Sequence, residues 1–408
     1  MAKTPKIRFA GFSDPWEMRK LGEIANYRRG SFPQPYGKSE WYDGEEAKPF
    51  IQVADITDSM NLVSDTKQKI SKLAQPMSVF AEKGSVLVTL QGSIGRVAIT
   101  QYGAFVDRTV LIFEKYKIDI DNLFWAYIIK QKFIKEARKA PGGTIKTITK
   151  EALSDFDLLL SNYNEQQKIG AFFSKLDKLI SLHQSKFEKL QKIKKSCLQN
   201  LFPQNNQNTP KIRFKNFSDE WVKNKYKNIG QCLSGGTLSY EDLDKNGIYK
   251  CILYGELYTR YDYIIKNIVF RTNKLGNKVI KNDILFPQST TVDAISLISP
   301  ACMNDDEAQT SGVFAIRPHK NIDGNFITYY TKGNFYQRNK LAKNAQGLTI
   351  VHLYYQSIKD ETILIPNLAE QCKISEFFTK LDKLIALHQS KFEKLQKIKK
   401  SCLQNMFV

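Results

Sequence analysis

The chain of 408 residues carries 61 Lys and Arg against 41 Asp and Glu, a formal net charge of +20, and 42% of its residues are hydrophobic. This size and composition predict two or three globular domains and exclude an intrinsically disordered chain. The charge favours a polyanionic partner, most simply nucleic acid, with an anionic membrane surface as the alternative.

The sequence shows no sign of membrane insertion or export. No apolar run approaches the ~20 residues that a membrane-spanning helix needs. The N-terminal stretch MAKTPKIRFAGFSDPW lacks the apolar segment of a signal peptide. We therefore expect a cytoplasmic protein.

An internal duplication organises the sequence. Residues 4–16 return in closely similar form at 209–221, and Glu165–Phe202 returns at Glu370–Phe407 with six of its 38 positions changed. One shift of 205 residues (209 − 4 and 370 − 165) relates both pairs. The chain is therefore two halves in tandem, each made of a leader, a body of its own sequence and a basic helix.

The first body is predicted to be mixed α/β. It opens with Leu21–Ile24 and a loop rich in Gly, Pro and Arg at Arg28–Gly37. Runs rich in Val, Ile and Phe predict strands at 49–56, 85–90, 96–100 and 105–113. Apolar residues at helical spacing predict a helix at 122–140, and a short helix followed by a strand at 156–160 is predicted within 145–160.

The second body repeats this plan with other residues. The sequence predicts an opening loop at Ser234–Ser239, strands at 249–257, 283–287 and 312–317, and a helix at 325–341. The segment 344–353 occupies the place that 140–148 occupies in the first half. We interpret the two bodies as one fold with two different surfaces.

The duplicated segments are predicted to be long helices. Apolar residues recur in steps of three and four over five heptads, which indicates a narrow seam for a partner helix, and the copy in the same chain is the nearest partner. Periodicity alone does not decide between a parallel and an antiparallel pair, but a twofold arrangement of two near-identical halves favours the antiparallel one. The expected fold class is α/β, with two mixed bodies related by a pseudo-twofold axis and joined by two long helices that form an antiparallel coiled coil. The seam is expected at Phe172, Leu176, Leu179, His183, Leu190, Phe377, Leu381, Leu384, His388 and Leu395.

His183 and His388 lie at the midpoints of the two segments. In an antiparallel pair the two imidazoles would meet near the axis that relates the helices, as a polar register element or a metal pair. The alternative is a pair of edge histidines satisfied by Gln184, Gln389 or water. A metal site needs more ligands than this pair offers, so we expect none.

Signatures of catalysis are missing. The sequence contains neither a phosphate-binding Gly-x-x-x-x-Gly-Lys-Ser/Thr loop nor an Asn/Asp-Pro-Pro-Tyr/Phe motif. Glu46-Ala47-Lys48, with Asp43 nearby, has the form of a nuclease motif but is short enough to arise by chance. With four His in all, the chain is expected to bind without a catalytic site of its own.

Basic, amide, hydroxyl and aromatic side chains gather in the turns of both bodies. Such side chains read base edges and contact phosphates, although any single one is more often a solvent contact. The candidates in the first body are Arg28, Arg29, Tyr36, Lys38, Trp41, Gln52, Gln91, Ser93, Arg96, Arg108, Thr144, Lys146 and Thr147. The candidates in the second body are Thr237, Tyr240, Tyr258, Arg260, Tyr261, Gln288, Ser289, Thr290, Thr291, Gln309, Thr310, Gln346, Thr349 and His352. Trp16 and Trp221 of the leaders are expected to be core anchors.

The double layout resembles a known family, the specificity (S) subunits of type I restriction-modification enzymes. The resemblance covers the whole chain and lies in the leader PKIRFAGFSDPW, the loop SGGTLS, the apolar pattern running into Glu-Gln-x-x-Ile at the end of each body, and the two FFxKLDKLIxLHQ helices. The loop GSFPQP of the first body departs from SGGTLS. The resemblance implies target-recognition domains at 1–160 and 210–365, spacer helices at 161–202 and 366–408, and a linker at 203–209.

The same resemblance implies a function and partners. Each recognition domain would read one half of a bipartite target on double-stranded DNA, and the helices would set the half-site spacing and dock two methyltransferase (modification) subunits. Motor-endonuclease (restriction) subunits would join the complex. The chain itself would hold no cofactor, because S-adenosylmethionine and ATP would be bound by those partners. Two alternatives stay open: a stand-alone bipartite DNA-binding regulator or scaffold, and a protein of the membrane surface.

Overall fold

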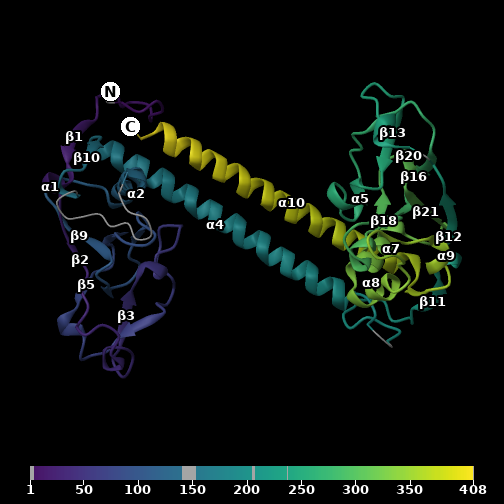
Figure 1. The fold of residues 1–408 in the computed structure, drawn as a ribbon, viewed down its shortest axis with the longest axis horizontal. Coiled ribbons are helices and arrows are strands. Elements are labelled where there is room, and N and C mark those ends of the chain that lie inside the picture. The colour runs from purple at the N-terminus through teal and green to yellow at the C-terminus, as the bar shows by residue number, and fades with distance from the viewer. Residues whose placement is uncertain (1–3, 140–152, 205–206, 237, 408) are drawn as a thin grey trace. The chain divides into compact units, whose positions relative to one another are not determined.

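A computed structural model describes residues 4–139, 153–204, 207–236 and 238–407. The chain divides into two compact units, Met1–Gln184 with Ser390–Val408, and Ser185–Gln389. Each unit combines one body with the beginning of one long helix and the end of the other, as the colours of Figure 1 show.

The first unit is built on two four-stranded sheets. One sheet has the antiparallel order β2 (Ala25–Arg29), β9 (Val110–Tyr116), β6 (Val86–Thr89), β7 (Val97–Ile99). The other has the order β4 (Gln68–Ile70), β3 (Lys48–Ile51), β8 (Ala104–Val106), β5 (Val79–Ala81), and its β3–β8 pair is parallel. The helices are α1 (Leu21–Ile24) and α2 (Asn122–Lys139), with short 3-10 turns at Ser39–Trp41, Val53–Asp55 and Gln75–Met77.

The second unit repeats this architecture. Its five-stranded sheet has the order β12 (Gly230–Ser234), β21 (Val313–Pro318), β17 (Ile284–Pro287), β19 (Ala301–Met303), β14 (Ile264–Ile265). Its four-stranded sheet has the order β15 (Arg271–Thr272), β13 (Tyr249–Leu253), β20 (Glu307–Ser311), β16 (Asn277–Ile280), and β13–β20 is parallel. A further pair joins β18 (Ser289–Thr290) to β22 (Val351–His352). The helices are α5 (Glu256–Thr259), α6 (Ala294–Leu297), α7 (Gly324–Thr328), α8 (Phe335–Ala342) and α9 (Tyr355–Ile358), with 3-10 turns at Tyr226–Asn228 and Tyr240–Asp242.

The pairing of strands corresponds between the bodies. β2–β9–β6 matches β12–β21–β17, and the parallel pair β3–β8 matches β13–β20. In both halves a strand just after the leader pairs with the strand before the long helix. These pairs are β1 (Glu17–Lys20) with β10 (Asp157–Leu160) and β11 (Val222–Lys225) with β23 (Thr362–Ile365), residue for residue 205 positions apart. The prediction of one fold with two sequences is confirmed.

Most predicted elements of the first body are present, but one predicted strand ends early and another is divided in two. The run predicted at 49–56 ends at Ile51 and continues as a 3-10 turn. The run predicted at 105–113 is two strands, because the Asp107 carboxylate accepts hydrogen bonds from the backbone N–H (2.9 Å) and hydroxyl (2.5 Å) of Thr109 and closes a turn between them. The short helix predicted after 145 falls largely outside the described residues.

In the second body the predicted strand 249–257 ends at Leu253, and the helix α5 follows. The helix predicted at 325–341 is also interrupted. A π-helical turn at Tyr329–Gly333 separates α7 from α8, and the Asn334 side chain caps α8 by accepting a hydrogen bond from the Gln337 N–H. The spacing of the apolar residues predicts neither the end of the strand at Leu253 nor the interruption of the helix at Tyr329–Gly333.

The duplicated segments are the helices α4 (Tyr163–Asn200) and α10 (Leu368–Asn405). Asn162 and Asn367 cap them, each accepting a hydrogen bond of 3.0 Å from the N–H three residues on. In the first unit the start of α4 and the end of α10 both contact the leader, and Asp177 pairs with Lys399 at 2.5 Å. In the second unit Lys194 pairs with Asp382 at 2.7 Å. The helices therefore run antiparallel, as predicted.

The predicted seam needs correction at several positions. Leu176 and Leu381 are buried, but Leu179 and Leu384 are 37% and 45% exposed. The half-buried positions that follow Leu176 on the same face of α4 are 180, 183 and 187. Consecutive residues of a helix point about 100° apart, so Leu179 points away from the face that carries Ile180.

Two other predicted seam positions face the leaders. Phe172 packs edge-on against Phe9 (ring centroids 5.9 Å apart), and Phe377 packs in the same way against Phe214 (5.8 Å). Neither aromatic ring is therefore a pure interhelical contact.

The meeting expected between His183 and His388 stays a prediction, since His183 belongs to the first unit and His388 to the second.

Aromatic residues at the helix ends close the two cores. Phe407, just beyond α10, packs against Trp16, Phe124 and Phe173 with ring centroids 5.7 to 6.3 Å apart. Its repeat counterpart Phe202 packs in the second unit against a matching set, Trp221, Phe326, Tyr330 and Phe378. Trp16 and Trp221 are 1% and 3% exposed, so their prediction as core anchors is confirmed. Within the described residues, no helix has the length and apolar character needed to span a membrane.

Candidate nucleic-acid interface

In the first body, six of the ten candidate side chains that the structure describes lie at one end of the β2–β9–β6–β7 sheet. At this end β2 and β6 finish and β9 begins, since Arg29 pairs with Leu111 and Thr89 with Val110. β7 also begins here, since Val97 pairs with Val88. A hydrogen bond of 2.8 Å from the Leu90 N–H to the Thr109 carbonyl joins the two turns that follow. The candidates at this end are Arg28, Arg29, Gln91, Ser93, Arg96 and Arg108.

The arginines at this end differ in their neighbours. The Arg108 guanidinium lies over the Tyr36 ring, 5.5 Å from its centroid, and has no carboxylate partner among the described residues. Arg28 lies 3.5 Å from Glu114, and Arg96 donates to the Ile56 carbonyl (3.3 Å) with the Asp58 carboxylate 3.7 Å away. Arg108 is therefore the side chain of this end best placed for an external anion.

Two other candidates of the first body are already engaged. Lys38 pairs with Glu40 at 3.1 Å and lies over the Trp41 ring, which is itself buried. Gln52 donates a long hydrogen bond of 3.4 Å to the Tyr36 hydroxyl. Thr144, Lys146 and Thr147 lie outside the described residues.

Gly30 allows the loop after β2 to pass close to the turn between β8 and β9. A Cβ atom at Gly30 would lie 2.1 Å from the Val106 carbonyl oxygen and 2.4 Å from that of Asp107. The Gly30 N–H donates to the Val110 carbonyl at 3.0 Å. This close backbone approach fixes the loop that carries Tyr36 against the turn that carries Arg108.

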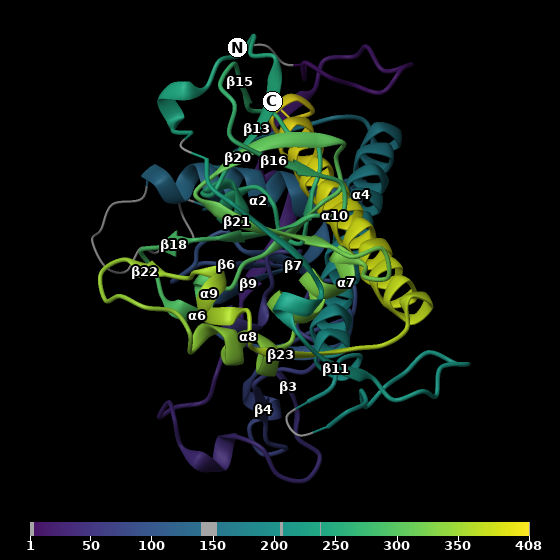
Figure 2. The ribbon, with the colours of Figure 1, turned by 90° about the vertical axis from the view of Figure 1, so that its right-hand side faces the viewer.

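The second body brings its candidates to the matching strand end. The Gln288 N–H donates to the Gly312 carbonyl at 3.1 Å, as Leu90 does to Thr109 in the first body. Ser289 and Thr290 form β18, and the Tyr258 hydroxyl donates to the Ser289 carbonyl at 2.9 Å. Figure 2 shows β18 beside β22, which brings the segment with Gln346 and Thr349 to the same end. Thr291, Gln346 and Thr349 are exposed there.

Several candidates of the second body are not free surface groups. Tyr261, Gln309 and Thr310 are 5%, 5% and 0% exposed, so these three predictions are wrong. The β13–β20 pairing buries Gln309 and Thr310, and their side chains bond the backbone of Gly276 and Asn277.

Two more are constrained without being fully buried. Thr290 is 9% exposed, and Arg260 pairs with Glu256 at 3.0 Å and lies over Phe270. Tyr240 and His352 are accessible, the latter stacked on Tyr354. Thr237 lies outside the described residues.

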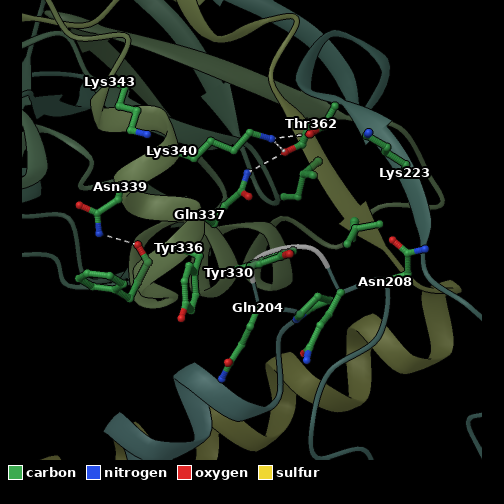
Figure 3. Close-up of a pocket in the computed structure, with 15 residues that line it drawn as sticks. Gln204, Asn208, Lys223, Tyr330, Tyr336, Gln337, Asn339, Lys340, Lys343 and Thr362 are labelled. Carbon is green, nitrogen blue, oxygen red and sulfur yellow. Dashed lines mark hydrogen bonds between the residues drawn. The ribbon is translucent and has the colours of Figure 1, made fainter.

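A polar cavity of about 700 Å³ in the second unit was not predicted (Figure 3). Lys223, Lys340 and Lys343 line it, together with amide side chains such as Asn208 and Gln337. Burial lowers the pKa of Lys340, which donates to the Thr362 carbonyl at 2.7 Å. These three lysines could contact phosphates, but Lys223 of β11 precedes Lys340 of α8 by 117 residues and Lys343, just after α8, by 120, so the sequence gave no local signal of the cluster.

The long helices carry equivalent pockets in the two units. Five residues of α4 line a cavity of about 430 Å³ in the second unit, and their repeat counterparts in α10 line one of about 620 Å³ in the first. These pairs are Gln191 and Gln396, Lys194 and Lys399, Lys195 and Lys400, Leu198 and Leu403, and Gln199 and Gln404. The rest of the lining differs. In the second unit it comes from the body, including Asp262, whereas in the first unit it combines Asp58, Ser59 and Gln131 of the body with Asp177, Ile180, Ser181 and Gln184 of α4.

A half-buried lysine donates a hydrogen bond to an aspartate backbone carbonyl that belongs to the lining of each pocket. Lys130 donates to the Asp58 carbonyl at 3.0 Å, and Lys332 donates to the Asp262 carbonyl. Burial lowers the pKa of both lysines. The helices also leave apolar side chains exposed at repeat-equivalent positions, namely Leu179, Leu182 and Ile193 in α4 and Leu384, Leu387 and Ile398 in α10.

The short nuclease-like motif is not assembled into a site by the described residues. Glu46 pairs with Lys72 at 2.8 Å. Across the described chain no group of three His, Cys, Asp or Glu side chains is arranged to hold a metal ion.

Comparison with known proteins gives a consistent result. A family model described as "Type I restriction modification DNA specificity domain" matches residues 13–194 and again 218–398. The type I restriction enzyme MjaVIII specificity subunit of Methanocaldococcus jannaschii is 22% identical over 404 residues, 96% of this chain and 91% of the relative. The type I restriction enzyme StySPI specificity subunit of Salmonella potsdam is 40% identical over 139 residues, 33% of this chain and 28% of the relative. A crystal structure of the S subunit of a type-I restriction-modification system from M. genitalium has the same fold, with a TM-score of 0.63 at 17% identity and 99% of each chain covered.

Proposed function

Because the chain belongs to the family of type I restriction modification DNA specificity domains, we propose that it is the DNA sequence-specificity subunit of a type I restriction-modification complex in the cytoplasm. Each body reads one half of a split target on double-stranded DNA. The two long helices set the distance between the half-sites.

The observation that carries this proposal is that equivalent strand ends of the two bodies carry different side chains. Arg29 faces Leu111 at the end of β2, and Ser234 faces Phe314 at the matching position of β12. Arginine hydrogen-bonds guanine in two places, whereas serine contacts either base or a phosphate. Two bodies of one fold would therefore read two different half-sites.

We propose ten side chains of the strand ends as the first to contact DNA. They are exposed or half-buried and lie at the ends described above. They are Arg28, Arg29, Tyr36, Arg96, Arg108, Gln288, Ser289, Thr291, Gln346 and Thr349. Lys223, Lys340 and Lys343 would add phosphate contacts, which position a protein on DNA without reading sequence.

The duplicated pockets support the docking of two copies of one partner, the methyltransferase subunit. Five residues from the C-terminal end of one long helix are the same in both pockets, while the rest of the lining differs. Lys195 and Lys400 make no ion pair within the described part of the chain and are free to meet acidic groups of a partner. The exposed leucines and isoleucines of the same helices would add apolar contacts.

In this proposal the chain performs no chemical step. S-adenosylmethionine and ATP are bound by the methyltransferase and motor-endonuclease partners, and the chain binds the DNA on which they act. A stand-alone bipartite regulator or scaffold is not favoured, because both halves match the specificity family.

An exchange of one body tests the proposal. Residues 230–365 are replaced by the corresponding body of another family member, and methylated adenines are mapped in the host genome by single-molecule sequencing. We expect one half of the recognised sequence to change and the other half to stay. The parent chain is the control, and a change in both halves would contradict the modular assignment.

A further inference from the structure

A tight turn in the second unit carries a fully exposed leucine. Leu348 is 99% exposed, the highest value among the large apolar side chains of the described residues. Ile350, two residues on, is 49% exposed. Single exposed apolar side chains are common on protein surfaces, so only the place of Leu348 in the fold can give it a role.

The turn around Leu348 is held in one conformation by its backbone. The Gln346 N–H donates to the His352 carbonyl at 2.9 Å, and the His352 N–H donates back to the Gln346 carbonyl at 2.7 Å. Gly347 has a φ of +110°, and a Cβ atom there would lie 2.1 Å from the Ile350 carbonyl oxygen. The sequence Gln-Gly-Leu therefore builds a narrow turn with the leucine at its tip.

The base of the turn is anchored in the core, while its tip faces outward. Val351 and Leu353 are 8% and 0% exposed. The Leu353 N–H donates to the Gln288 carbonyl at 3.0 Å, next to the pairing of β22 with β18. The tip is thereby fixed at the strand end that carries Gln288 and Thr291 (Figure 2).

The segment is chemically compatible with DNA. Residues 343–354 contain no Asp or Glu, and Lys343 precedes the turn. Gln346 and Thr349 flank Leu348 with groups that hydrogen-bond base edges. In the major groove the apolar group that a duplex presents is the C5-methyl of thymine, which aliphatic side chains contact.

We propose that Leu348 reads the C5-methyl group of a thymine in the half-site recognised by the second body, between hydrogen bonds made by Gln346 and Thr349. The inference rests on the proposed function and adds a specificity-determining residue to it.

The test combines a protein change with a DNA change. Duplexes carrying the mapped target, with each thymine of one half-site replaced in turn by deoxyuridine, are titrated against the wild-type chain and the Leu348→Ala variant. We expect deoxyuridine at one position to weaken wild-type binding about three- to tenfold, as expected for one buried methyl contact. Leu348→Ala should bind the thymine duplex more weakly by a similar factor and should not distinguish it from the deoxyuridine duplex.

A matched control is Ile248→Ala. Ile248 is 71% exposed and lies just before β13. Leu253, at the opposite end of this strand, pairs with Ser311, close to the strand end that carries Gln288. This variant should keep the wild-type affinity and the full deoxyuridine penalty. It controls for the removal of an exposed aliphatic side chain from the same unit.

Three outcomes would overturn the inference. Leu348→Ala could retain the deoxyuridine penalty, or it could weaken methyltransferase assembly without changing DNA binding. A rise in 2-aminopurine fluorescence in the half-site that depends on Leu348 would instead indicate a wedge between bases. If wild-type chain failed to prefer its mapped target over unrelated DNA, the proposed function would fail, and not this inference alone.

Discussion

At the residue scale, a buried ion pair ties each leader to the helix at the end of its body. Arg8 makes two hydrogen bonds, of 2.9 and 2.8 Å, to the Glu165 carboxylate, which is fully buried. Arg213 and Glu370 repeat the pair at 2.7 Å. Hydrogen bonding to Glu165 raises the pKa of Arg8. The Trp16 indole N–H donates to the same carboxylate at 3.1 Å, so the leader is fastened at two points.

The variant Arg8→Ala tests this attachment. Removing the guanidinium leaves the Glu165 carboxylate buried without its charge partner, which costs about 3–5 kcal/mol in comparable sites. We expect the first unfolding transition in urea to move to lower denaturant by an amount of that order. Arg19→Ala is the control, because Arg19 and Glu17 are 43% and 71% exposed and such pairs contribute about 0–1 kcal/mol. Equal losses of unfolding free energy in Arg8→Ala and Arg19→Ala would exclude a special role for the buried pair.

At the element scale, the apolar periodicity within each segment predicted the two long helices, and the near-identity of the two copies favoured their antiparallel pairing. Burial in the bodies was not predictable in the same way. Gln309 looked like a base reader and is a core residue, since only the parallel pairing of β13 with β20 covers it. The partner of Arg8 lies 157 residues away, and no local pattern identifies it. Strands of two or three residues, such as β18 and β22, are also too short to leave a period.

A heptad inserted into both long helices tests their role as a spacer. Seven residues preserve the alternating steps of three and four along the seam and lengthen each helix by about 10 Å. We expect the chain to prefer half-sites about three base pairs further apart, since DNA rises about 34 Å in a turn of ten. Binding to targets of varied spacing measures this. A four-residue insertion into α4 alone, which shifts the seam against α10, is the comparison and should weaken binding at every spacing. Unchanged spacing in the heptad variant would exclude the helices as the spacer.

At the scale of the whole molecule, the two junctions between a helix end and a leader are alike. The Ile7 N–H donates to the Asn405 carbonyl at 2.9 Å, and the Ile212 N–H donates to the Asn200 carbonyl at 2.8 Å. The second junction is a continuous chain, with 11 residues between Asn200 and Ile212. Across the first, three residues follow Asn405 and six precede Ile7, nine in all. The same backbone hydrogen bond is therefore made where the helix and the leader follow one another in sequence and where they lie far apart in it.

A permuted chain should consequently fold and bind its target. Val408 is joined to Met1 through two added residues, Gly-Ser, which makes the new connection 11 residues long like the natural one, and the chain is opened within 203–210. Since both backbone hydrogen bonds and the Phe407 and Phe202 contacts stay in place, we expect binding of the mapped duplex within about threefold of wild type. A chain joined in the same way but opened between Ser185 and Lys186 interrupts α4 and should lose binding, because the helix can no longer connect the two halves. If both permuted chains bound equally well, the continuity of α4 would not be required for recognising a split target.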